Sequence, residues 1–110
     1  MTRLPGAAAA FVDPRKISAY LLNATHPQNG GKARFFYDHG FGAETLAASL
    51  ADHPQRHPIA QEQANAHGRK FVVHCMLASP DGRDPCITSV WIIDAGDSRP
   101  RLVTAYPRGA

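Results

Sequence analysis

The chain has 110 residues, of which 44% are hydrophobic and 19% charged, and its formal net charge at pH 7 is +3. This length and composition fit one globular domain with a single modest core, and they exclude a disordered chain. No apolar run approaches the roughly 18 residues that cross a membrane, and residues 7–12 are too few for the apolar segment of a signal peptide, so we expect a cytoplasmic protein that makes no membrane contact.

Three helices are predicted in the first half of the chain, after a flexible lead-in over residues 1–12. A proline, a glycine and an alanine run interrupt any periodic pattern in that lead-in, so the domain spans residues 13–110. Asp13 is typical of a helix N-cap, and the proline after it suits the first helical position. An apolar stripe then predicts a helix over Pro14–Leu22. The stripe consists of Ile17, Tyr20 and Leu21.

A glycine-rich loop over Asn23–Gly31 separates this helix from two more. Neighbouring phenylalanines predict a second helix over Lys32–His39. Leucines four residues apart predict a third over Ala43–Asp52, which we expect Pro54 to end. The polar residues 59–66 are compatible with a further short helix, closed by a glycine.

From residue 70 onward the period of the apolar residues changes to that of strands. The predicted strands are Lys70–Leu77, Cys86–Asp94 and Arg101–Tyr106, and turn-forming residues join them. Helices followed by an antiparallel meander indicate an α+β fold, with N-terminal helices packed on a C-terminal sheet of three to four strands. One face of such a sheet is covered by the helices, and the other face is partly exposed to water.

The two cysteines, Cys75 and Cys86, form no CxxC motif and lie in different predicted strands. We expect buried free thiols that behave as small hydrophobic residues. A disulfide between neighbouring strands is the alternative, and only geometry decides between them.

The loop from His26 to Lys32 is the first candidate site, because a histidine and a lysine flank two glycines just before a helix start. Backbone N–H groups at a helix start attract phosphate, and a histidine exchanges protons near neutral pH. The spacing is not that of a phosphate-binding P-loop. A solvated loop is therefore the alternative interpretation.

The second candidate site is the exposed sheet face, since several polar residues interrupt the apolar strands. Cleaving RNA without a metal requires a base for the 2′-hydroxyl, an acid for the leaving oxygen and donors for the charged phosphorus. The alternative is that threonine and tyrosine are present as good strand formers. The residues concerned are His74, Thr88, Ser89, Thr104 and Tyr106.

Neither a metal nor a cofactor is expected. His53 and His57 have a spacing that suits one helix face, but prolines interrupt that segment, and no zinc-binding motif is present.

Two stretches resemble a small bacterial domain family of unassigned function. They are KISAYLLNATHPQNGGKARFF, residues 16–36, and TSVWIIDAGDSRPRLVTAYP, residues 88–107. The family also occurs as a C-terminal module of toxin-like proteins. Its plan of helices followed by a sheet is similar to that of the barnase/EndoU/colicin/RelE-type toxin ribonucleases, whose sheet face holds the RNA-cleaving residues.

The resemblance and the basic composition lead to our first hypothesis, a toxin-type, metal-independent endoribonuclease acting on tRNA or mRNA. His26 serves as general base or acid, Lys32 holds phosphate, and Thr104 and Tyr106 contribute hydroxyls. A further set of residues is assigned to substrate binding. These are Lys16, Thr88 and Arg101.

The second hypothesis is a non-enzymatic interaction protein, such as an immunity protein, an antitoxin or a phage inhibitor. The exposed edge of a small sheet accepts a strand from a target protein or a cognate inhibitor, or from a second copy in a homodimer. A third hypothesis is a module that binds a small ligand or nucleotide at Gly30, Gly31 and Lys32. Expression separates the first two hypotheses, because a toxin arrests growth when it is expressed alone and an inhibitor does not.

Overall fold

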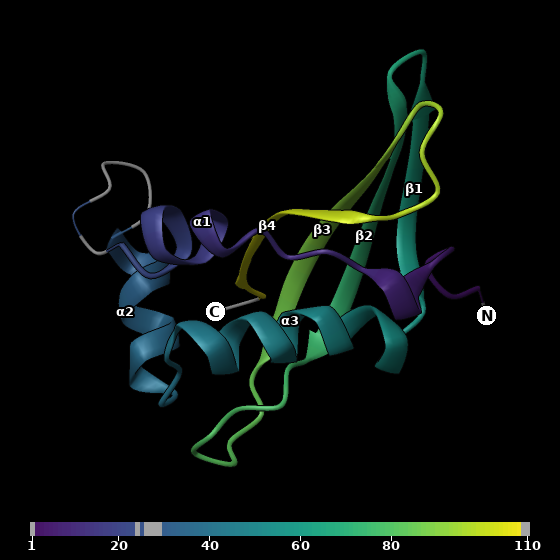
Figure 1. Ribbon diagram of the computed structural model, residues 1–110. Helices are drawn as coiled ribbons and strands as arrows, with labels where there is room; N and C mark the ends of the chain where they lie inside the picture. The colour runs from purple at the N-terminus through teal and green to yellow at the C-terminus, as the bar shows by residue number, and fades with distance from the viewer. Residues whose placement is uncertain (1, 24, 26–29, 109–110) are drawn as a thin grey trace.

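The computed structural model describes residues 2–23, 25 and 30–108, which form helices followed by an antiparallel sheet (Figure 1). The α+β layout predicted from the sequence is confirmed. Asp13 caps the first helix as expected, since its side chain accepts a hydrogen bond from the backbone N–H of Arg15. The helical elements are η1 (Ala7–Ala9), α1 (Pro14–Lys16), the π-helical turn η2 (Ile17–Leu21), α2 (Gly30–Asp38) and α3 (Ala43–Arg56).

The sheet is a four-stranded meander in which each strand pairs with the next one along the chain. Because facing residues of an antiparallel pair point to the same side of the sheet, the register defines rows of side chains that cross the strands. These rows organise the candidate site described below. The strands are β1 (Ile59–Asn65), β2 (Gly68–Met76), β3 (Cys86–Asp94) and β4 (Arg101–Pro107).

One face of the sheet, here called the inner face, packs against α3. Leu46 and Leu50 of α3 are buried in one hydrophobic cluster with Phe71 and Trp91 of the sheet. On β2 the buried residues alternate with more exposed ones, among them Lys70, as expected for a strand with one covered side. The opposite side, the outer face, carries the polar and basic residues discussed below.

The segment from Ile59 to Asn65 forms strand β1, so the short helix expected there is wrong. Alanine, glutamine and glutamate favour helix by local propensity, but pairing with β2 satisfies this backbone instead. The hairpin depends on Gly68, whose φ is +150° and where an added Cβ would lie 2.4 Å from the carbonyl oxygen of Ile93. Gly68 and Ile93 are far apart in the sequence, so local helix propensity does not reflect the contact between them.

Pro54 does not end the third helix as expected, because α3 continues to Arg56. His53 and Pro54 are both buried, and the ring of His53 is hydrogen-bonded to the sheet. Packing of this last turn against the sheet therefore outweighs the loss of one helical hydrogen bond at proline.

The expectation of two free thiols is wrong, because Cys75 and Cys86 form a disulfide. It links β2 to β3 across a sequence separation of 11 residues, and its Cα atoms are 4.2 Å apart. Both cysteines are half-buried. The pairing of the two strands brings them together, which the sequence spacing alone does not specify.

Residues 2–12, expected to be a flexible lead-in, contact both edges of the sheet: the Thr2 oxygen accepts a hydrogen bond from Ile59 N of β1, and Phe11 lies beside β4. Leu4 is buried, and the backbone of Phe11 accepts a hydrogen bond from Leu102 N and donates one to the Pro100 oxygen. Phe11 thereby forms a parallel bridge with Arg101 at the free edge of β4. No helix among residues 2–23, 25 and 30–108 is long and apolar enough to cross a membrane.

Candidate functional site

Lys32 lies at the centre of a polar cluster formed by three elements. Its Nζ donates a hydrogen bond of 2.8 Å to the hydroxyl of Tyr20 in η2 and one of 3.1 Å to Oγ1 of Thr104 in β4. The first turn of α2 carries Lys32, and the packing of α2 beside β4 brings the ammonium group to the sheet. We call Tyr20, Lys32, Thr104 and Tyr106 the Lys32 cluster.

Aromatic rings complete the surroundings of the ammonium group. Nζ of Lys32 lies 5.0 Å from the ring centroid of Tyr20 and 5.7 Å from that of Tyr106. Nζ of Lys16 lies 5.6 Å from the Tyr20 ring centroid. The ring faces attract cations, so they help to hold both lysines at this position. Tyr106 remains 39% exposed, which leaves the cluster open to a ligand.

The phenol of Tyr20 is chemically altered by its neighbours. The hydrogen bond from Lys32 lowers the pKa of Tyr20 below its ordinary value, and a hydrogen bond with Thr104 adds to the effect. A lower pKa makes this phenol a better proton donor than an isolated tyrosine.

His74 and Thr88 form a second polar pair on the outer face, in the same row as Tyr106. The register aligns Thr88 with His74 on one side and with Tyr106 on the other. Nδ1 of His74 lies 2.8 Å from Oγ1 of Thr88. Partial burial lowers the pKa of His74 below 6.5, and the charge of Arg108 adds to this shift. At neutral pH its imidazole is therefore uncharged and able to accept a proton.

The structure brings most of the predicted site residues together. Lys32, Thr104 and Tyr106 meet in one cluster, Thr88 lies in the same row as Tyr106, and Lys16 contacts the ring of Tyr20. His26 lies outside the described residues.

Arg101 lies away from this cluster. Its guanidinium donates two hydrogen bonds, of 2.8 and 3.1 Å, to the carboxylate of Asp94. Arg101 pairs with Ile92, whereas Thr104 pairs with Val90, so the arginine belongs to a different row of the sheet.

Tyr20 is a functional candidate that sequence reasoning missed, because it was predicted only as a member of an apolar stripe. Its ring does contribute to packing, but its hydroxyl points to Lys32. The one available signal was the lysine four residues earlier, since residues at i and i+4 share a helix face. Nothing in the sequence indicated the contact with Lys32.

The two histidines with helical spacing serve the packing of α3 on the sheet. Nε2 of His53 donates to the backbone oxygen of Cys75 at 2.8 Å, and Nδ1 accepts from the Ser89 hydroxyl at 2.8 Å. Trp91 Nε1 in turn donates to that hydroxyl. Nε2 of His57 bonds to the Met76 oxygen. Across the described residues, no group of three or more His, Cys, Asp or Glu side chains is arranged to hold a metal ion.

Comparison with solved structures shows that the fold is shared with another protein. A chain of a "Contact-dependent growth inhibition toxin - immunity protein complex from Klebsiella pneumoniae 342" superposes with a TM-score of 0.72. The two sequences are 16% identical, and the match covers 97% of this chain and 100% of that one. No curated protein matches the sequence.

The resemblance to a domain family of unassigned function, expected from the two quoted motifs, is confirmed. A family model described as "Domain of unknown function (DUF6883)" matches residues 3–109. Because this match spans nearly the whole chain, the protein belongs to the DUF6883 family.

Proposed function

We propose that this protein is a toxin-type, metal-independent endoribonuclease whose site is the Lys32 cluster together with the His74–Thr88 pair. The observation that carries the proposal is the bonding of the Lys32 ammonium group. Its ammonium group bonds to two hydroxyls, and within the described part of the chain it forms no ion pair. A half-buried cation with no carboxylate partner among the described residues attracts an anion such as phosphate.

The neighbouring groups fit the remaining steps of RNA cleavage. Neutral His74 takes the proton of a ribose 2′-hydroxyl, and the freed oxygen attacks the adjacent phosphorus. Lys32 stabilises the charge that develops on the phosphate oxygens. The bond to the 5′-oxygen breaks, and the phenol of Tyr20 gives that oxygen a proton. The products are a 2′,3′-cyclic phosphate and a free 5′-hydroxyl.

Lys32, Thr104 and Tyr106 keep their predicted parts in this scheme. Thr88, predicted to bind substrate, has a different part, and Arg101 has none, because it is bonded to Asp94 in another row. Thr104 and Tyr106 position the ammonium group and contribute hydroxyls, and Thr88 orients the imidazole of His74. Lys16 adds positive charge beside Tyr20. The role of His26 as base or acid stays a prediction.

Similarity to a chain of a growth inhibition toxin–immunity complex supports a role in a toxin system. The basic balance of the sequence, with a net charge of +3, also suits an RNA substrate.

The direct test is incubation of the purified protein with total RNA in the presence of EDTA. Cleavage is expected, with fragments that end in 2′,3′-cyclic phosphate. Intact RNA after incubation with an excess of folded wild-type protein contradicts the proposal.

The second candidate is an immunity-type protein that binds a toxin through the edge of β1. Six of the seven residues of β1 are exposed, and β2 is the one described strand that pairs with it. Ile59 at the start of β1 also donates its N–H to the Thr2 oxygen. Such an edge is able to accept a partner strand. Expression in bacteria separates the candidates: growth arrest by the wild-type protein alone supports the toxin, and normal growth at high expression supports the immunity protein.

A further inference from the structure

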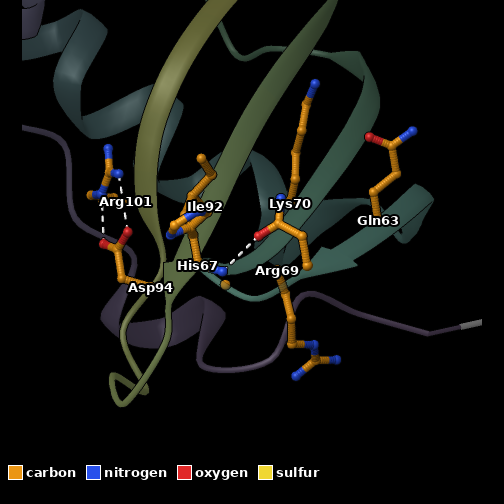
Figure 2. Close-up of a pocket in the computed structure, with 9 residues that line it drawn as sticks. Gln63, His67, Arg69, Lys70, Ile92, Asp94 and Arg101 are labelled. Carbon is orange, nitrogen blue, oxygen red and sulfur yellow. Dashed lines mark hydrogen bonds and ion pairs between the residues drawn. The ribbon is translucent and has the colours of Figure 1, made fainter.

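A cavity of about 210 Å³ opens on the outer face, and residues that line it are shown in Figure 2. None of them belongs to the Lys32 cluster. One row of the sheet crosses it, because Gln63, Lys70, Ile92 and Arg101 face one another in successive strands. Each of the four strands contributes one of these side chains. The proposed function gives no role to this cavity.

The end wall of the cavity is held by two hydrogen bonds, one to a side chain and one between backbone groups. Asn65 Oδ1 accepts a hydrogen bond of 2.8 Å from His67 N, and the His67 oxygen accepts one of 2.9 Å from Ala95 N. The hairpin between β1 and β2 is thus tied to the turn after β3. A wall fixed in this way is preorganised, which lowers the entropy cost of binding a ligand.

The lining combines an apolar surface with groups that recognise a nucleotide. Ile92 is half-buried and gives an apolar surface for a base. The Gln63 amide can both donate and accept hydrogen bonds at a base edge. Lys70 is exposed and forms no ion pair with any described residue, so it is available to a phosphate. Asp94 holds the guanidinium of Arg101 through two hydrogen bonds, which fixes its plane.

The size of the cavity limits the ligand. Its volume of about 210 Å³ is below the roughly 300 Å³ at which pockets for drug-sized molecules begin. It therefore suits a single base or one ribose phosphate. A smaller hollow of about 50 Å³, lined by Gln61, Gln63, Lys70 and Val72, lies on the same face and extends toward the next row.

The distance to the Lys32 cluster is short. Ile92 of the cavity and Val90 are successive outward residues of β3, and Val90 pairs with Thr104 of the cluster. Two residues of a strand span about 7 Å. Neighbouring nucleotides of one RNA strand can therefore occupy the cluster and the cavity together.

We propose that this cavity is the subsite for the RNA nucleotide adjacent to the one whose phosphate binds Lys32, and that it confers base preference. This inference rests on the proposed function. Lys70 binds the phosphate of that nucleotide, Ile92 supports its base, and Gln63 reads the base edge.

Binding of a short 2′-O-methyl RNA tests the subsite, because the blocked 2′-oxygen prevents cleavage. Lys70→Gln is expected to raise the Kd about tenfold, and Gln63→Ala is expected to weaken binding and reduce discrimination among the four bases. Arg56→Gln is the matched control. It removes the same charge, but Arg56 lies in α3, on the inner-face side of the sheet, and pairs with Asp52. We expect less than a twofold change in this control.

A second measurement locates the RNA independently of the variants. Addition of the same oligonucleotide is expected to shift the methyl NMR signals of Ile92. RNA cleavage by the wild type is measured in parallel. If the wild type cleaves RNA but both cavity variants bind like Arg56→Gln and Ile92 does not respond, the subsite is refuted and the endoribonuclease stands. If the wild type neither cleaves nor binds RNA, both proposals are overturned.

Discussion

Lys32 and Thr104 are 72 positions apart in the sequence and are joined by a hydrogen bond of 3.1 Å between Nζ and Oγ1. This bond connects the start of α2 to the outer face of the sheet, and Tyr20 of η2 shares the same ammonium group. The helical layer therefore has a second role beside covering the inner face. It brings the ammonium group of Lys32 to β4, whose own side chains at the candidate site carry only hydroxyls.

Loss of the ammonium group is expected to remove RNA cleavage. Lys32→Met keeps much of the side-chain length but no charge, and we expect a fall in kcat of about 10²–10³, the range found when one transition-state donor is removed. Arg34→Met is the matched control, since Arg34 is an exposed residue of the same helix. Equal activity of the two variants contradicts the assignment of Lys32.

The hydroxyl of Tyr20 is expected to matter more than its ring. Tyr20→Phe keeps the packing but removes the proposed proton donor, so kcat should fall about 10²-fold or more. The loss should be smaller on RNA whose leaving oxygen is replaced by sulfur, because a thiolate leaves without a proton. Tyr37→Phe serves as control, since its hydroxyl bonds to the Leu22 oxygen outside the cluster. A Tyr20→Phe enzyme with wild-type kcat on both substrates rules out this role.

The free energy of unfolding is expected to decrease as the pH falls from about 6.5 to about 4, because of His53. Burial lowers the pKa of His53 to about 4, against 6.5 for the exposed side chain. The unfolded state therefore binds more protons than the folded state between these values, and the folded state loses stability as the pH falls through that window. From pH 7 to pH 5 we expect a loss of about 2 kcal/mol in the free energy of unfolding.

Urea unfolding at the two pH values measures this effect. His53→Gln should be less stable at pH 7 and should lose most of the difference between pH 7 and pH 5. His39→Gln should retain that difference, because His39 lies after α2 and takes no part in the contacts of His53 with Ser89 and Cys75. A pH dependence unchanged in His53→Gln would assign the effect to another group.

Reduction of the disulfide is expected to destabilise the sheet. Cys75 and Cys86 close a loop with a sequence separation of 11 residues. Loop-closure entropy predicts a loss of about 3 kcal/mol when such a bond is opened. Urea unfolding with and without dithiothreitol measures it, and the double variant Cys75→Ser, Cys86→Ser should be unaffected by the reductant. A wild-type midpoint that does not move on reduction contradicts the prediction.

Some elements could be predicted from the sequence because their signals are local. Asp13 with the following proline marks the start of the first helix, and the observed β3, Cys86–Asp94, has the predicted bounds. Strand β1 could not be predicted in this way. Its residues favour helix locally, and they are extended because β2 offers a row of backbone partners.

The candidate site, too, was predictable only where its signals are local in the sequence. The sequence by itself determined the α+β class, the starts of the first and third helices, the three C-terminal strands and the residue types available for chemistry at Lys32, Thr104 and Tyr106, because spacing, caps and turns act within a few positions. Helix α2 begins at Gly30 and not at Lys32 as predicted. Only the tertiary structure decided that Lys32 meets Thr104 and Tyr20, and that Asp94 neutralises Arg101 in another row. Those contacts depend on strand register and on the packing of α2 beside β4, and both are set by pairing between segments far apart in the chain.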